Sequence, residues 1–185
     1  MKSKISFIVA FLIACPILLT SCASGPAYQK ADAPATKAVI YVYRPSRILG
    51  AALSYSLWDV TNAIVTKKVS IVPNDAFGYS PAKDTRIDEF KEGLKYSKKL
   101  ARLVNGSYYA YTVEPGTYYF IVENTSGILQ GWGVTDAVTK VEAEAGKRYF
   151  FYSWVGGGGR AYMETRTVEN GEKEITGCKL VVEEK

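Results

Sequence analysis

"NGSYYAYTVEPGTYYF", residues 105–120, is the stretch that decides which fold this sequence predicts. An Asn-Gly pair and a Pro-Gly pair, both turn signals, bound a run of aromatic and β-branched residues of the kind that favours strands. Because side chains alternate between the two faces of a strand, Tyr109 and Tyr111 share one face with Val113. The stretch therefore predicts neighbouring strands with one apolar-aromatic side that is buried.

The two turns leave the pairing of these strands open. A Pro-Gly turn that pairs Val113 with Tyr118 places Tyr111 opposite Phe120, and the Asn-Gly turn is typical of a tight type I′ hairpin. Pro-Gly favours type I or II turns, however, and their twist suits a tight hairpin poorly. Strands that belong to different sheets are therefore the alternative, and the buried face is predicted in both cases.

The sequence from residue 37 onward repeats this pattern. "KAVIYVYRP", residues 37–45, is apolar on both faces and predicts a strand buried on both sides. Residues 52–58 and 63–72 predict a hairpin, and Asn170-Gly171 marks a late turn. About nine strands with glycine-centred turns predict an all-β fold, a single antiparallel β-sandwich of immunoglobulin-like or transthyretin-like type.

Residues 73–97 interrupt the strand pattern. The segment is polar, and Ile87, Phe90 and Leu94 would lie on one side of a short helix over residues 84–93. It predicts a short helical insertion that lies over the sheet. Long insertions in compact domains are often functional, so we expect this one to be an interaction element.

Residues 1–21 predict a lipoprotein signal peptide that is cleaved. Two lysines precede an uncharged apolar run over residues 5–19, which is short for a membrane span. The run ends in Leu-Thr-Ser-Cys, which resembles a bacterial lipobox. The resemblance implies that Cys22 carries a diacylglycerol thioether and an acylated amino group. An uncleaved anchor helix is the alternative.

Residues 22–36 comprise the lipidated cysteine and a segment whose Ala, Pro and Ser content predicts a flexible tether to a domain over residues 37–185. No aspartate follows Cys22, which by resemblance to Gram-negative sorting signals favours the outer membrane, facing the periplasm; a Gram-positive surface is the alternative. Lysine and arginine number 23 against 18 acidic residues, and the two signs are interspersed. This distribution predicts no nucleic-acid partner.

Several motifs resemble a bacterial lipoprotein family known only as domain of unknown function 2846. They are "VYRP" at residues 42–45, "LVNGSYYAYTVEPGTYYF" at 103–120 and "EAEAGKRYFF" at 142–151. The resemblance implies a lipobox followed by an immunoglobulin-like or transthyretin-like sandwich, and it lends no catalytic residue and no ligand. The insertion at residues 73–97 departs from the family pattern.

The residues available for catalysis are few. The chain has no histidine, which excludes Ser-His-Asp and Cys-His arrangements and imidazole-based zinc sites. "SPAK" at residues 80–83 lacks the partner motifs of Ser-x-x-Lys enzymes, and "GGGGR" at 156–160 lacks the ending of a phosphate-binding loop. Cys178 is left without a disulfide partner and is predicted to be buried. We expect no metal and no cofactor.

These observations predict a lipid-anchored cell-envelope protein whose domain is a non-enzymatic binding or scaffolding module for a protein or the cell wall. The alternative is a hydrolase of envelope polymers that uses carboxylates, such as Glu142 with Glu144. Besides Cys22, the candidate interaction residues are aromatic or basic side chains in loops, in the insertion or on the outer strand faces: Phe90, Tyr108, Tyr119, Trp132 and Arg160.

Overall fold

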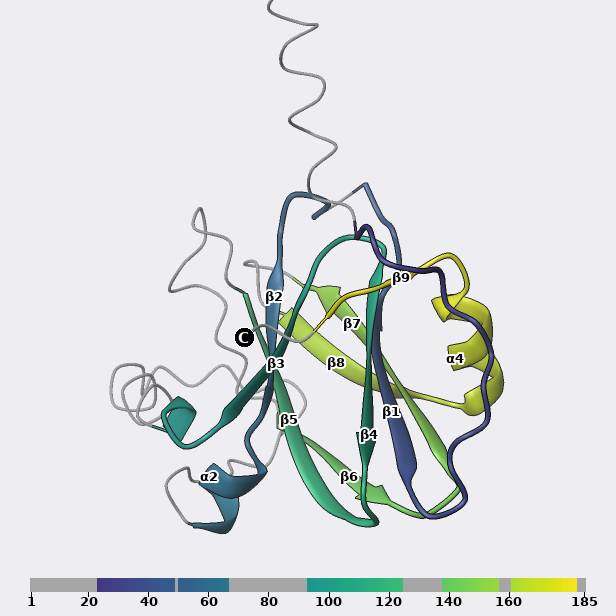
Figure 1. The fold of residues 1–185 in the computed structure, drawn as a ribbon. Helices are drawn as coiled ribbons and strands as arrows, with labels where there is room; N and C mark the ends of the chain where they lie inside the picture. Colours follow the sequence, from purple (N-terminus) through teal and green to yellow (C-terminus); the bar gives the residue numbers. More distant parts are fainter. Residues whose placement is uncertain (1–22, 49, 67–92, 125–137, 157–160, 183–185) are drawn as a thin grey trace, which may run out of the picture.

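The computed structural model describes residues 23–48, 50–66, 93–124, 138–156 and 161–182 (Figure 1). In this part of the chain, strands form two facing sheets, which confirms the prediction of an all-β sandwich. The first sheet has the order β8-β7-β1-β4-β9 and the second the order β3-β2-β5-β6. The strands are β1 (Ala38–Arg44), β2 (Tyr55–Asp59), β3 (Lys98–Leu103), β4 (Ser107–Val113), β5 (Gly116–Asn124), β6 (Thr139–Ala143), β7 (Arg148–Val155), β8 (Ala161–Arg166) and β9 (Lys179–Leu180).

Strand β1 lies at the centre of the first sheet, and all of its residues are buried, as its two apolar faces predict. It pairs antiparallel with β4 and parallel with β7, and β4 also pairs parallel with β9. The prediction of a wholly antiparallel sandwich is therefore wrong. Parallel pairing needs a long connection between the two strands. In the sequence, all strands of the second sheet lie between β1 and β7.

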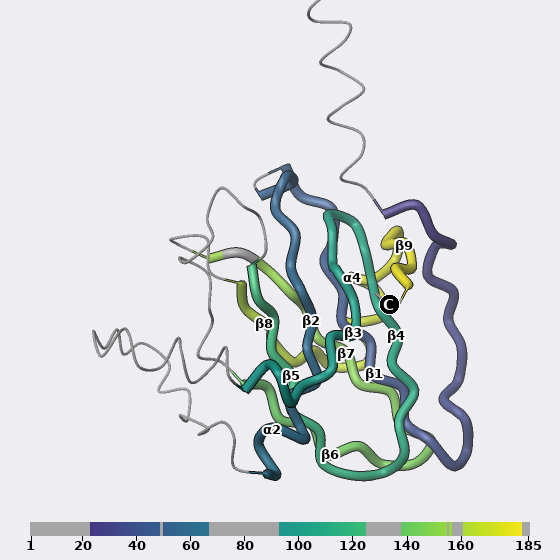
Figure 2. Tube along the Cα trace, turned by 60° about the vertical axis from the view of Figure 1, so that its left-hand side comes forward, coloured from purple at the N-terminus to yellow at the C-terminus, as the bar shows by residue number. Residues whose placement is uncertain are grey.

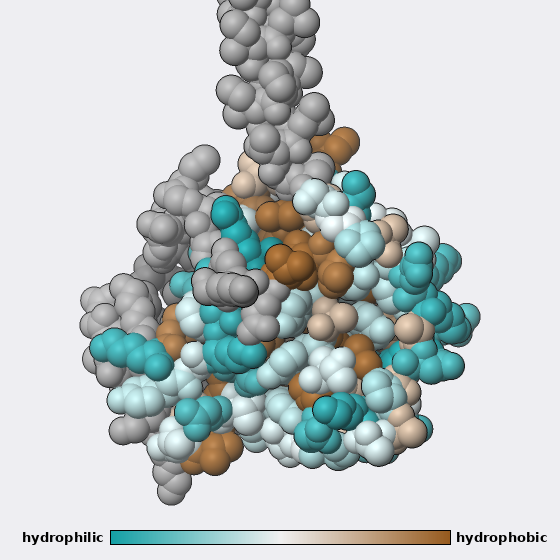
Figure 3. Space-filling view, viewed as in Figure 1, coloured by the Kyte–Doolittle hydropathy of each residue, from teal (hydrophilic) through white to brown (hydrophobic). Residues whose placement is uncertain are grey.

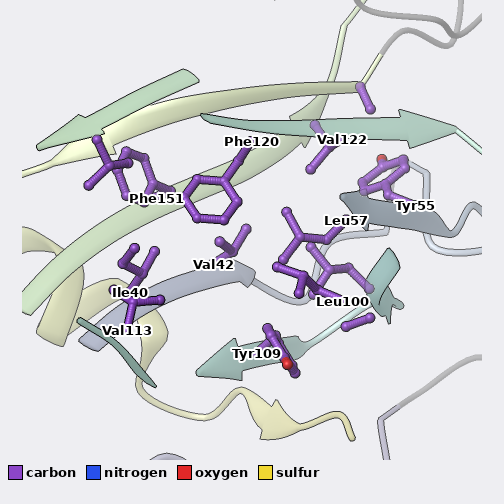
Figure 4. Close-up of a cluster of buried hydrophobic side chains, with 14 of the residues drawn as sticks. Ile40, Val42, Tyr55, Leu57, Leu100, Tyr109, Val113, Phe120, Val122 and Phe151 are labelled. Atoms are coloured by element: carbon purple, nitrogen blue, oxygen red, sulfur yellow. The ribbon is translucent and has the colours of Figure 1, made fainter. Parts of the chain in front are cut away.

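The core between the sheets is built from the inward faces of both (Figure 4). Ile40 and Val42 of β1 face Leu57 of β2 and Phe120 of β5, and Phe151 of β7 closes the same cluster. All five side chains are almost completely buried. At about 1.5–3 kcal/mol for each large apolar side chain removed from water, this layer is the main source of stability.

The tyrosine-rich stretch contributes to this core from both sheets. Val113 pairs with Ala38 and Tyr118 with Val141, so β4 and β5 do not form a hairpin and the pairing of Val113 with Tyr118 is wrong. The face assignment is nevertheless correct, since the rings of Tyr111 and Phe120 meet edge to face, 6.3 Å apart, across the sandwich. A turn that crosses between sheets brings the same faces together as a hairpin would.

The Asn-Gly turn also crosses between sheets, because β3 pairs with β2 whereas β4 pairs with β1 and β9. The expected tight hairpin is therefore absent at this turn. Asn105 is buried there, and its side-chain oxygen accepts a hydrogen bond of 2.9 Å from the backbone N–H of Arg47. Gly106 adopts a φ of 68°, which glycine tolerates at little cost.

Two short helices replace elements that the sequence predicted differently. Helix α2 (Thr61–Val65) overlaps the start of the segment predicted as a strand over residues 63–72. Residues 67–72 of that segment lie outside the described residues. Helix α4 (Val168–Ile175) replaces the predicted turn at Asn170-Gly171. Thr167 caps it by accepting a hydrogen bond from the Asn170 N–H.

Gly171 lets α4 lie directly on the outer face of β7. A Cβ atom at this position would lie 2.3 Å from the Cβ of Phe150, so no larger residue fits without moving the helix. The Asn-Gly pair thus marks a close approach of helix and sheet, with Gly171 buried.

Gly171→Ala is expected to destabilise the domain by about 2 kcal/mol. Alanine would favour the helix by about 1 kcal/mol, but overpacking against Phe150 costs more than that. Urea unfolding measures the difference. Lys173→Ala, on the exposed side of the same helix, is the control and should change stability by less than about 0.5 kcal/mol. Equal stability of Gly171→Ala and the native chain would contradict the packing of α4 on β7.

Residues 23–36, which we call the N-terminal arm, lie along the outer side of the first sheet (Figure 2). The backbone N–H of Tyr28 donates to the Cys178 carbonyl at 2.9 Å, and Ala27 forms a bridge with Lys179. The Tyr28 ring packs edge to face on Tyr41, 5.6 Å away. The prediction of a flexible tether is therefore wrong for this part of the arm, because its alanine- and proline-rich composition conceals an aromatic anchor.

Charged groups fasten the arm to α4. Glu172 accepts a hydrogen bond of 2.8 Å from the Lys30 ammonium and forms a second ion pair of 2.6 Å with Arg148. Arg148 also donates to the Ala31 carbonyl at 3.3 Å. The hydrogen bond from Lys30 is the largest influence on the pKa of Glu172, which it lowers, and Arg148 adds to the effect.

Docking of the arm is expected to weaken in acid. Because the pKa of Glu172 is lowered in the folded state, its contribution is fully present above the ordinary value of 4.5 and is lost as the pH falls through the lowered value. Hydrogen exchange of the Tyr28 amide should lose protection over that range, while the amides of β1 keep theirs. Glu172→Gln should reduce the protection of Tyr28 at neutral pH and remove its pH dependence. Unchanged protection of Tyr28 in this variant would exclude the fastening role.

Candidate functional site

The sequence-predicted interaction residues do not form one site. Phe90, Trp132 and Arg160, as well as Cys22, lie outside the described residues. So do residues 73–92 of the insertion, and with them all but the last residue of the helix expected over 84–93; Gly93 and Leu94 are helical and precede β3.

The two predicted tyrosines have different surroundings. Tyr119 is half-buried on the outer face of the second sheet, where its backbone N–H donates to Thr61 of α2 at 3.0 Å. Tyr108 is 7% exposed, so its prediction as an exposed aromatic residue is wrong. The Tyr28 ring of the arm covers it edge to face at 5.7 Å, and burial raises the pKa of Tyr108.

A different group of side chains forms the candidate binding surface, which we call the aromatic–arginine surface. It lies on the outer face of β7 and β8, beyond the part of the first sheet that α4 and the arm cover. Register places the side chains in rows, since Tyr152 pairs with Glu164 and Trp154 with Tyr162. The surface consists of Trp154 from β7, Tyr162, Glu164 and Arg166 from β8, and Arg47 from the loop after β1. The two arginines lie over the Tyr152 ring of β7, which is itself only 6% exposed.

The Trp154 and Tyr162 rings are stacked at one end of this surface. Their centroids lie 4.8 Å apart with an interplanar angle of 23°, and both side chains are only partly buried. The Trp154 indole N–H donates to the Glu164 carboxylate at 2.9 Å, which fixes the orientation of the ring. The pair therefore presents an ordered aromatic edge to solvent at small further cost in side-chain entropy.

Arg166 connects this pair to α4. Its guanidinium donates to Glu164 at 2.8 Å and to Glu174 of the helix at 3.3 Å, and it lies 4.7 Å above the Tyr152 ring. Glu174 also accepts a hydrogen bond of 2.7 Å from the buried Tyr43 hydroxyl. Burial and this bond raise the pKa of Tyr43, so its proton stays in place.

Arg47 supplies a second cation. Arg47 is an exposed residue of the loop after β1, and its guanidinium lies 5.4 Å above the same Tyr152 ring. Among the residues that the structure describes, no carboxylate forms an ion pair with Arg47, whereas both carboxylates near Arg166 are bonded to it. Within the described part of the chain, Arg47 is thus the cation of this surface without a carboxylate partner, and such a guanidinium suits an anionic or polar ligand.

This arrangement is suited to binding. Stacked aromatic edges bind apolar or planar groups, and a guanidinium binds anions. The carboxylates Glu164 and Glu174 both accept hydrogen bonds from the Arg166 guanidinium, which fixes their positions. The predicted pair Glu142 and Glu144 is exposed on and after β6, and Glu142 is bonded to Lys140 and Thr117.

Two further predictions concern cysteine and metal chemistry. Cys178 is 2% exposed, as predicted, and burial raises the pKa of its thiol to about 11. A thiol of this kind is largely protonated at neutral pH and reacts slowly. The described residues contain no group of three or more His, Cys, Asp or Glu side chains placed to hold a metal ion.

Sequence reasoning missed the aromatic–arginine surface because its members are spread over three segments. The alternation of "RYFFYSWV" at residues 148–155 does put Tyr152 and Trp154 on one face. No comparable pattern reveals that Arg47 lies above Tyr152, since that contact depends on the parallel pairing of β1 with β7.

Comparison with protein-family models, with curated proteins and with solved structures found no match for this chain. The resemblance to the lipoprotein family therefore remains a prediction from the quoted motifs. Within the described part of the chain, none of the helices has the length and apolar character needed to cross a membrane.

Proposed function

We propose that this protein is a lipid-anchored protein of the cell envelope, attached through Cys22, whose β-sandwich domain is a non-enzymatic binding or scaffolding module. The anchor is supported by the sequence of residues 1–22, in which a short apolar run ends in Leu-Thr-Ser-Cys. The absence of aspartate after Cys22 supports the outer membrane as its location, with the domain in the periplasm.

The observation that carries the binding role is the stacked pair of Trp154 and Tyr162. Two large aromatic side chains are partly exposed there, and a hydrogen bond from Trp154 to Glu164 holds them in place. Ordered aromatic side chains beside an available arginine are enriched at sites where proteins bind other proteins. The same chemistry suits a cell-wall polymer, because sugar rings stack on aromatic faces and acidic groups bind arginine.

Lipidation of Cys22 is expected to decide where the protein resides. Mass spectrometry of the native protein from detergent-extracted membranes should show an N-terminal cysteine that carries a diacylglycerol and an acyl chain. Cys22→Ser should abolish the modification and leave the chain in its unprocessed form. Because several acyl chains at about 0.8 kcal/mol for each methylene hold a protein at a bilayer, the native protein should float with vesicles. A native N-terminus other than a modified Cys22 would exclude the anchor.

Removal of the Trp154 and Tyr162 side chains is expected to abolish binding of the partner. Crosslinking in cells followed by mass spectrometry should lose its main crosslinks in a double variant, Trp154→Ala with Tyr162→Ala. The domain should stay folded, since both side chains are only partly buried. Tyr96→Ala, which removes an exposed tyrosine outside this surface, is the matched control and should keep the crosslinks.

Hot-spot aromatic residues cost about 2 kcal/mol or more when truncated, so binding of the double variant should fall at least about 30-fold. Unchanged crosslinks in the double variant would place the binding site elsewhere. Release of sugars from purified cell wall by the native protein would instead favour the carboxylate hydrolase.

A further inference from the structure

Four segments meet at one end of the domain, which we call the arm end. They are the loop over residues 45–53, the turn at Gly106, β9 and the N-terminal arm, and each contacts the next. The loop over residues 45–53 meets the turn at Gly106, where a Cβ would lie 3.5 Å from Ser46. The Gly106 carbonyl accepts from the Lys179 N–H at 2.9 Å, and the next N–H, of Leu180, donates to the Pro26 carbonyl of the arm at 2.8 Å. Figure 1 shows these segments together at the top of the domain, where the described chain begins at Ala23.

The arm is fastened at its first residues. Ala23 is 7% exposed, and Gly25 lies so close to β9 that a Cβ would be 2.0 Å from the Leu180 carbonyl oxygen. Cys22 is therefore a single residue, about 3.8 Å of chain, from a docked position. A lipid on Cys22 would hold the arm end against the bilayer rather than leave the domain on a long tether.

The arm end also carries the most exposed apolar side chains of the described residues. Ile48 is 96% exposed at the tip of the loop, and Val182 is 79% exposed just after β9. Apolar residues gather in the upper part of the face drawn in Figure 3, near the ends of β4 and β9. Burying two such side chains among lipids removes apolar surface from water and therefore favours docking.

Ile48 is presented by a supported loop. The buried Arg44 guanidinium lies beneath the loop, stacks on the Tyr55 ring at 4.4 Å, and donates to the carbonyls of Leu53 and Gly50. The backbone closes above it, since the Ala51 N–H donates to the Ile48 carbonyl at 3.2 Å. These contacts hold the backbone of the loop in place, while the Ile48 side chain points away from the core.

Basic residues lie at the same end of the domain as this apolar tip. Exposed Arg47 directly precedes Ile48, has no carboxylate partner among the described residues, and lies at the same end as exposed Lys179. Cations near an apolar tip suit anionic lipid headgroups.

We propose that the arm end docks on the surface of a phospholipid bilayer, with Ile48 inserted among the lipids and Arg47 at the headgroups. This inference rests on the proposed lipid anchor and deepens it, because it states which face of the domain the anchor directs to the membrane. The opposite end, which carries α2 and the Gly116 and Gly146 turns, then faces away from the membrane (Figure 1).

The test places one environment-sensitive fluorescent amino acid at Ile48 or at Val65. Val65 is the matched control, since it is also apolar and 70% exposed but lies on α2 at the opposite end. Native lipidated protein is reconstituted on vesicles of phosphatidylethanolamine and phosphatidylglycerol that contain a nitroxide-labelled quencher lipid. The probe at position 48 should shift to the blue and be quenched several-fold more strongly than the probe at position 65. Equal quenching at the two positions would overturn the proposal.

Two further measurements separate this inference from the lipid anchor itself. A chain that begins at Cys22, with its thiol coupled to a maleimide lipid, has the same attachment point whether or not cells lipidate Cys22. The contrast between positions 48 and 65 should persist there, and its absence would overturn the docking. Gly25→Ala should undock the arm by collision with Leu180 and reduce the contrast. A contrast unchanged by Gly25→Ala would show that the fastened arm does not orient the domain, contrary to the proposal.

Discussion

Burial of both faces of β1 is the constraint on which the rest of the structure depends. A strand with apolar side chains on both sides needs a cover on each, and the sandwich supplies them differently. The second sheet covers the inner side, where Ile40 and Val42 meet Phe120. Among the residues that the structure describes, no third sheet lies above the outer side with Tyr41 and Tyr43. Helix α4 and the N-terminal arm cover it. The end of the first sheet that these two elements leave uncovered is the part that is available for binding.

This constraint also explains what the sequence could and could not predict. Strand faces were predictable, because alternation is a local property, and Tyr109, Val113 and Phe120 are buried as expected. The partners of strands were not, since a turn of a given sequence joins strands within a sheet or between sheets. Tyr108 was predicted as exposed for a related reason. Its burial depends on Tyr28, 80 positions away in the sequence and in a segment whose composition is typical of a linker.

The candidate site was less predictable than the fold. Its aromatic residues come from one visible alternation, but their neighbours come from elsewhere: Arg166 is shared with Glu174 of α4, and Arg47 comes from the loop after β1. Helix α4 itself was read as a turn, because an Asn-Gly pair ordinarily favours one. Here the glycine serves a close contact with Phe150 instead. Local signals thus predicted strands and core, whereas the site arises from contacts between distant segments.

The bridge between Ala27 and Lys179 has a consequence for the order in which the molecule is assembled. Contacts between residues that are far apart in the chain form late, because closing a long loop costs conformational entropy. Because a chain is synthesised from its N-terminus, the arm emerges long before its binding partners on β9 and α4. The arm must therefore wait for the last residues of the domain. Docking of the arm therefore marks the completion of the whole chain, and until then the arm does not cover the two tyrosines beneath it, Tyr41 and Tyr108.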